Sequence, residues 1–205
     1  DLHRDLMAEL IAELQTYFEH EPDVYVSGNL LIYYVEGDRQ KRVAPDVFVV
    51  RGVPKHERRI YKLWEEQRAP DVVFEISSRG TILNDTQKKA VLYARWGVQE
   101  YFLYDPEYDW LPEGLAAHRL VDGVYEDIAI ENGAAHSEVL GLDVVDTGET
   151  LRLREPRTGA FLLTREETNA ARQQAEAARQ EAEAARQQAE MRAQAEMEAR
   201  ALAEA

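Results

Sequence analysis

One segment of this chain is apolar on both faces and still carries a carboxylate. Residues 70–78 read Pro-Asp-Val-Val-Phe-Glu-Ile-Ser-Ser. A short run without a polar face is typical of a strand covered on both sides, so it predicts the centre of a sheet. Alternation places Glu75 on the same face as Asp71, Val73 and Ser77. A buried carboxylate is costly unless it is paired, protonated or bound to a metal, so Glu75 needs one of these.

Composition limits the classes of function. The length of 205 residues predicts one main domain plus an accessory segment, and 45% hydrophobic residues are enough for a core. A net charge of -15 argues against general nucleic-acid binding but is compatible with a small basic groove. The absence of cysteine excludes disulfides and thiolate metal sites and favours a reducing cytoplasm. We find no run apolar enough for a membrane span.

Strand and helix signals alternate through the first two thirds of the chain. We expect a helix over 1–19, strand-rich sequence over 24–35 with a bend at Gly28-Asn29, a buried strand at 45–50, and a surface loop or crossover over 55–69. After the central strand, Asn84 or Asp85 caps a helix that ends at Gly97. The next strand, 100–104, completes a βαβ unit with parallel strands. Residues 115–154 predict antiparallel strands, with a hairpin turn at Asp122-Gly123.

The C-terminal segment has a different composition. Residues 165–205 are mostly Ala, Glu, Gln and Arg, and heptads of the form AARQQAE begin at Ala170, Ala177 and Ala184. We therefore divide the chain into a domain, 1–164, and a helix or coiled coil, 165–205. An alanine seam with 4-3 spacing buries little area, so two interpretations are open. The segment is either a solvated single helix or a coil that forms a homo-oligomer.

Two acids and a lysine form the candidate site. Asp46 opens one buried strand, Glu75 lies within the central strand, and Lys88-Lys89 follow on the next helix. Carboxylates on neighbouring strands can share Mg²⁺ or Mn²⁺, with the carbonyl of Ile76 as a further ligand. A nearby ammonium can orient the attacking water. An ion pair between Asp85 and Lys89, four residues apart on the helix, is a competing use of that lysine.

Each of these residues also has a plain structural interpretation. Asp46 can be a turn acid, Glu75 can pair with an arginine, and Lys89 can be a solvated helix residue. We count as accessory candidates Asp71, Ser77, Glu13 and Lys88. The five histidines have no ligand spacing, which argues against zinc, and the serines lack the context of a nucleophile elbow.

A combined motif over residues 44–106 resembles a known family. The pattern is Pro45-Asp46, then Glu75-Ile-Ser77, then Lys89-x-x-x-Tyr93-Ala-x-x-Gly-Val-x-Glu-Tyr, then Asp105-Pro106. It is similar to the Uma2 family of the PD-(D/E)XK restriction-endonuclease-like superfamily, and the resemblance extends over residues 1–164. It implies a mixed β-sheet flanked by helices and Mg²⁺-dependent hydrolysis of phosphodiester bonds by Asp46, Glu75 and Lys89.

The chain departs from the wider superfamily at one position. The lysine expected two residues after the acid is Ser77 here. The resemblance implies that its role has moved to the helix, and the Lys-Ala-Val-Leu-Tyr spacing selects Lys89 over Lys88. We therefore expect a metal-dependent nuclease with DNA as its substrate, although the sequence leaves RNA open. The alternative is a non-catalytic module of the same fold that binds a partner or nucleic acid and assembles through its C-terminal helix.

Overall fold

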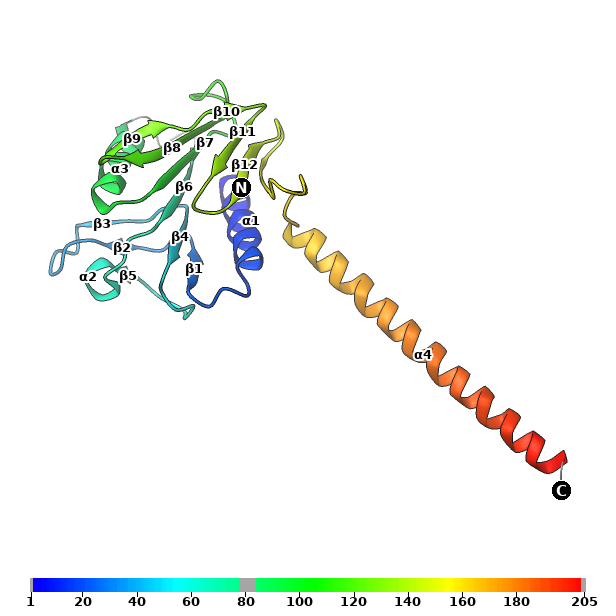
Figure 1. Ribbon diagram of the computed structural model, residues 1–205. Helices are drawn as coiled ribbons and strands as arrows, with labels where there is room; N and C mark the ends of the chain where they lie inside the picture. The colour runs from blue at the N-terminus through cyan, green and yellow to red at the C-terminus, as the bar shows by residue number, and fades with distance from the viewer. Residues whose placement is uncertain (1, 78–83, 204–205) are drawn as a thin grey trace. The chain divides into compact units, whose positions relative to one another are not determined.

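The computed structural model describes residues 2–77 and 84–203 of the chain. It divides into two compact units, Asp1–Leu162 and Leu163–Ala205. Among the described residues, the first unit contains the labelled strands and helices α1 to α3, and the second contains one long helix. The expected α/β class with a mixed sheet is confirmed in the first unit (Figure 1).

A six-stranded sheet is the centre of the first unit. Its spatial order is β1 (Val24–Ser27), β4 (Val47–Arg51), β6 (Val72–Ile76), β7 (Glu100–Tyr104), β8 (Leu115–Val121) and β9 (Val124–Asp127). Strand β6 lies inside the sheet, antiparallel to β4 and parallel to β7. All five of its residues are buried, which confirms the expected central strand and the βαβ unit.

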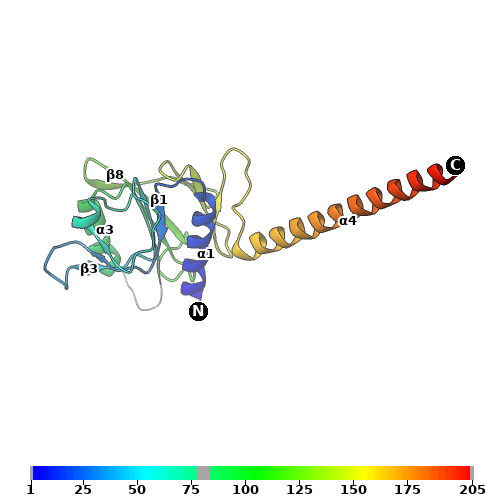
Figure 2. The same ribbon diagram turned by 90° about the horizontal axis from the view of Figure 1, so that it is seen from below.

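Two helices cover opposite faces of this sheet. Helix α1 (Leu2–Tyr17) and helix α3 (Asn84–Trp96) lie on either side of the strands in both views (Figures 1 and 2). Alternation along β6 explains the two cores, because Phe74 packs in the cluster that contains Leu10 of α1, whereas Val73 packs with Tyr93 of α3. The face that carries Glu75 is therefore the α3 face.

A three-stranded sheet corrects the expectation of a loop over 55–69. It consists of β3 (Arg42–Val43), β2 (Ile32–Tyr33) and β5 (Tyr61–Lys62), and the short helix α2 (Leu63–Glu66) follows β5. Strand β5 pairs in parallel with β2, and the ring of Tyr61 is fully buried. The charged side chains around Tyr61 concealed this strand, because some of them pair with one another, as Arg58 does with Glu66 at 2.7 Å.

The segment 115–154 is antiparallel as expected, but it divides between two sheets. Strands β8 and β9 extend the main sheet through a turn in which Asp122 and Gly123 have φ of 49° and 82°. A separate four-stranded sheet follows: β10 (Ile130–Glu131), β11 (Ala134–Ser137), β12 (Leu142–Asp146) and β13 (Leu151–Arg154). The buried carboxylate of Glu100 on β7 links the two sheets by accepting hydrogen bonds from Ser137 Oγ and from the Glu138 N–H just after the end of β11.

The second unit is helix α4 (Arg165–Ala203). Thr164 and Glu167 form a capping box, in which each residue's side chain accepts a hydrogen bond from the other's backbone N–H. The alanines at the expected seam positions between 171 and 189 are exposed. The helix is confirmed, and its association with another chain remains a prediction. No helix among residues 2–77 and 84–203 has the length and apolarity needed to cross a membrane.

Candidate functional site

The pairing of β4 with β6 brings the two predicted acids together. The register pairs Val47 with Phe74, so one further step places Asp46 opposite Glu75. Cross-strand neighbours share a face of the sheet. Burial is the main cause that raises the pKa of the Glu75 carboxyl, and the negative charge of Asp46 adds to it. The structure therefore places Asp46 and Glu75 at opposing positions on adjacent strands, as expected.

Glu75 is buried and is held at both oxygens by helix α3. Its Oε2 accepts from Lys89 Nζ at 2.9 Å, and its Oε1 accepts from the Tyr93 hydroxyl at 2.6 Å. Lys89 and Tyr93 lie four residues apart, on the same face of the helix. Burial raises the pKa of Glu75 to about 7; Lys89 opposes this shift and Asp46 adds to it. Glu75 is thus a buried acid whose charge is only partly neutralised.

Asp46 is fixed by the backbone and by helix α1. Its Oδ2 accepts from the Ile76 N–H at 2.8 Å and lies 3.2 Å from His3 Nε2. Its side chain remains 16% exposed, so Asp46 is the solvent-facing acid of the pair. Gly28 packs against the backbone of Asp46, and a Cβ at Gly28 would lie 2.0 Å from the Asp46 carbonyl oxygen. Ile76 contacts the site through its N–H, which donates to Asp46. The expected binding of a metal by its carbonyl oxygen remains a prediction.

Two of the four accessory candidates belong to other polar networks. Asp71 accepts from the Arg51 N–H at 2.6 Å and from Gln99 Nε2 at 2.8 Å, which joins the ends of β4 and β7. It shares a face with Glu75 but lies four residues away, or about 13 Å along the strand. Ser77 Oγ donates to Asp105 at 2.9 Å instead of facing Glu75.

The other two accessory candidates also lie apart from the acid pair. Glu13 is buried on α1, where it pairs with Arg152 of β13 at 3.3 Å. Lys88 is exposed, whereas Lys89 reaches Glu75, so the geometry separates the two lysines as the spacing predicted. The side chain of Asp85, the competing partner for Lys89, lies outside the described residues.

Two contacts at the site had not been predicted. Tyr93 appears in the motif without an assigned role; in the structure its ring is buried and its hydroxyl donates to Glu75. The Lys-x-x-x-Tyr spacing was an available signal, because residues four apart on a helix face the same neighbour. His3 had no such signal, since its contact with Asp46 joins residues 43 positions apart.

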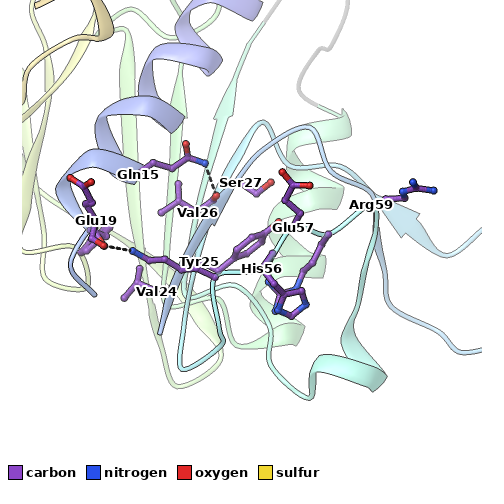
Figure 3. Close-up of a pocket in the computed structure, with 12 residues that line it drawn as sticks. Gln15, Glu19, Val24, Tyr25, Val26, Ser27, His56, Glu57 and Arg59 are labelled. Atoms are coloured by element: carbon purple, nitrogen blue, oxygen red, sulfur yellow. Dashed lines mark hydrogen bonds between the residues drawn. The ribbon is translucent and has the colours of Figure 1, made fainter. Parts of the chain in front are cut away.

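A cleft of about 570 Å³ lies away from these residues. It is bounded by the end of α1, the edge strand β1 and the segment 55–59 (Figure 3). Gln15 donates to the Val26 carbonyl across it, and Lys55 donates to the Glu19 carbonyl. None of the predicted site residues lines this cleft, so the cleft is not the place where we expect catalysis.

Comparison with known families agrees with this geometry. The profile of the Uma2 family, described as "Putative restriction endonuclease", matches residues 1–147. The chain belongs to the Uma2 family. The match includes Asp46, Glu75, Lys89 and Tyr93 and ends before α4. The family description supports a nuclease-like protein, in agreement with the resemblance seen in the motifs.

A solved structure supports the fold independently. The chain is similar to a "putative nuclease belonging to DUF820" from Anabaena variabilis ATCC 29413, with a TM-score of 0.51 and 16% sequence identity. The alignment covers 68% of this chain and 74% of that one. At this identity the likeness establishes a shared fold. No curated protein gives a significant match.

Proposed function

We propose that this member of the Uma2 family is a divalent-metal-dependent nuclease that hydrolyses phosphodiester bonds of DNA. The observation that carries the proposal is the Lys89 ammonium 2.9 Å from a buried Glu75 that lies opposite Asp46 on the next strand. Acids and an amine in this arrangement can hold a cation and a water beside a phosphate. The family description supports the same reaction class.

The donor set fits Mg²⁺ or Mn²⁺. Asp46 and Glu75 supply the oxygen ligands that these ions prefer, and the Ile76 carbonyl is the third ligand we propose. The raised pKa of Glu75 indicates that its negative charge is incompletely stabilised, and a bound cation would stabilise it. When bound, the metal would polarise the phosphodiester and lower the pKa of a coordinated water.

The chain's own side chains have separate roles in this proposal. Tyr93 holds Oε1 of Glu75, and His3 and the Ile76 N–H hold Oδ2 of Asp46, so both carboxylates are oriented before substrate binds. Lys89 partly neutralises Glu75 in the metal-free protein, and it can orient the water or the phosphate once Glu75 is bound to a cation.

One observation favours the non-catalytic alternative. Both oxygens of Glu75 and one oxygen of Asp46 already accept from protein donors. Within residues 2–77 and 84–203, no group of three or more His, Cys, Asp and Glu could hold a metal. An acid pair whose oxygens are already hydrogen-bonded within the protein agrees with a non-catalytic module. Such a module would keep the nuclease fold and bind a partner or nucleic acid without cleaving it.

Cleavage of labelled duplex DNA with and without Mn²⁺ separates the two functions. We expect metal-dependent cleavage by the natural chain and its loss in Glu75→Ala and Asp46→Ala. Lys88→Met is the matched control for Lys89→Met, because only Lys89 touches an acid of the site. Cleavage that survives Glu75→Ala would remove the assignment. Calorimetry that detects no binding of millimolar Mn²⁺ or Mg²⁺ would favour the non-catalytic module.

We also propose that helix α4 associates with the same helix of a second chain. Support comes from the exposed alanine seam between 171 and 189, which repeats with 4-3 spacing. Arg186 pairs with Glu190 along the helix at 2.8 Å, beside the seam and not across it. The seam therefore remains available for close helix packing.

A further inference from the structure

Positive charge gathers in one part of this acidic chain. The segment from 33 to 62 contains eight lysines and arginines against four acids, whereas the whole chain carries a net charge of -15. This segment forms the hairpin β2–β3, the strand β4 and the chain that leads into β5. A local reversal of the overall charge is typical of a surface that meets a polyanion.

Several of these cations already have acidic partners, whereas those of the hairpin have none among the described residues. Arg51 pairs with Glu21, Arg58 with Glu66, and Lys62 with Glu65. In the part of the chain that the structure describes, three exposed hairpin cations have no acidic partner: Arg39, Lys41 and Arg42. Their charge is therefore available to a ligand.

The hairpin holds these cations in a defined arrangement. The Tyr34 N–H donates to the Lys41 carbonyl at 3.1 Å, and the Lys41 N–H donates to the Asp38 carbonyl at 3.2 Å. Gly37 has φ of 82°, which allows the tight reversal. Beside it lies a cleft of about 380 Å³ whose lining includes two cations, Arg39 and Lys62, and one acid, Asp38, together with Tyr33, Val35, Gly37, Ile60 and Trp64. Val35 and Ile60 are 43% and 39% exposed, so the surface combines cations with apolar side chains.

The hairpin is also tied to the acid pair. Strand β3 ends at Val43, three residues before Asp46, so at most about 10 Å of chain separates them. The ring of Tyr34 packs on Trp96 at 5.4 Å, and Trp96 packs on Tyr93, whose hydroxyl holds Glu75. Both views place β3 beside α3 (Figures 1 and 2). The hairpin is thus fixed next to the site by its covalent connection and by an aromatic chain.

We propose that the β2–β3 hairpin binds the phosphate backbone of duplex DNA next to the bond presented to Asp46 and Glu75. This inference rests on the proposed nuclease function and names the surface that holds its substrate. Arg39, Lys41 and Arg42 contact phosphates, and the net charge of -15 disfavours DNA binding over most of the remaining surface. Binding through phosphates fixes position without reading sequence.

The test is the salt dependence of DNA binding, measured in EDTA so that cleavage does not interfere. Anisotropy of a fluorescent duplex of about 20 base pairs gives the observed binding constant between 25 and 200 mM KCl for the full chain. Each phosphate contact contributes about 0.9 to the slope of log K against log salt. We expect the triple variant Arg39→Gln, Lys41→Gln, Arg42→Gln to lower the slope by about 2 to 3 and affinity at 100 mM salt by at least about tenfold.

A second triple variant controls for net charge. Arg172→Gln, Arg179→Gln and Arg186→Gln remove three exposed charges from α4, and we expect the slope to stay as in the natural chain. Equal slopes for the two triple variants would overturn the inference, as would absence of binding by the natural chain at 25 mM salt. The metal-dependent cleavage assay tests the acids separately. A chain that binds with the expected slope but does not cut would therefore refute the nuclease proposal alone.

Discussion

Burial disfavours the charged form of Glu75, and the neighbouring Lys89 offsets this only in part. With 3% of its surface exposed, it loses most of the hydration that would stabilise a charge. Lys89 lowers its pKa, but Asp46 raises it, and the balance remains at about 7. The residue is therefore divided between its charged and neutral forms near neutral pH, and this has a measurable consequence for stability.

Replacing Glu75 by glutamine should change how stability depends on pH. The pKa of Glu75 is raised in the folded chain, so the folded state holds this proton between pH 4.5 and about 7 while the unfolded state releases it. Stability is thus fully present below pH 4.5 and falls as pH rises to about 7. Glu75→Gln removes this loss, so from pH 4.5 to 8 it should gain about 3 kcal/mol relative to the natural chain.

The measurement is urea unfolding in EDTA at several pH values. Glutamine keeps the shape of the side chain, and its carbonyl oxygen can accept from Lys89 while its NH2 group donates to the Tyr93 hydroxyl oxygen, so the fold should persist. A difference in unfolding free energy that stays constant from pH 4.5 to 8 would contradict the raised pKa of Glu75.

Replacing Lys89 by methionine should have the opposite dependence on pH. At pH 8 it leaves a charged Glu75 without its ammonium, which should cost about 2 to 3 kcal/mol of unfolding free energy. At pH 5 Glu75 is protonated and the cost should be small. The matched control is Lys88→Met, which should stay within about 0.5 kcal/mol at both pH values because Lys88 is exposed. Equal losses for both lysines at pH 8 would place the Lys89 contact in doubt.

At the scale of elements, one tripeptide is used in two ways. Ala-Pro-Asp precedes both β4 and β6, ending at Asp46 and Asp71. Asp46 lies opposite Glu75 and is partly exposed, whereas Asp71 is buried and accepts from Arg51, Arg68 and Gln99. Asp71 therefore joins the sheet at the end away from the acid pair.

Asp71→Ala should destabilise the domain without affecting the site. It leaves the Arg51 N–H and the Gln99 amide without their acceptor, which should cost about 3 kcal/mol of unfolding free energy. The folded variant should bind Mn²⁺ in calorimetry as the natural chain does. Asp46→Ala should show the reverse, a smaller loss of stability and no Mn²⁺ binding. If the folded Asp71→Ala variant fails to bind Mn²⁺, Asp71 contributes to the metal site after all.

The elements that sequence could predict are those whose signal is local. The apolar run of β6, the helix over 1–19 and the Asp122-Gly123 turn each carry their own pattern and are confirmed. Strand β5 was missed because its two residues are defined by pairing with β2, not by their own periodicity. The site divides in the same way: the Glu75–Lys89 contact follows a motif, whereas His3 reaches Asp46 only through the packing of α1.

At the scale of the whole molecule, association through helix α4 is limited by the small apolar area of the alanine side chains at the seam. Burying one methyl group contributes about 1 kcal/mol or less, so the six seam positions from 171 to 189 provide little energy for pairing. The repeated Arg and Glu residues stabilise the helix by itself, as the Arg186–Glu190 pair does. We therefore expect association through α4 to be weak and strongly dependent on concentration.

Sedimentation equilibrium of three chains tests this expectation. The natural chain should be largely monomeric at 1 μM and should self-associate above roughly 10 μM, since small interfaces of this kind give weak complexes. A chain that ends at Leu163 should stay monomeric throughout. Ala175→Leu, Ala182→Leu and Ala189→Leu together enlarge the apolar surface along one row of the seam, so association should tighten at least tenfold. If the truncated chain keeps the mass of the natural one, the interface lies in the domain; if the leucine variant stays monomeric, the seam is a solvated helix face.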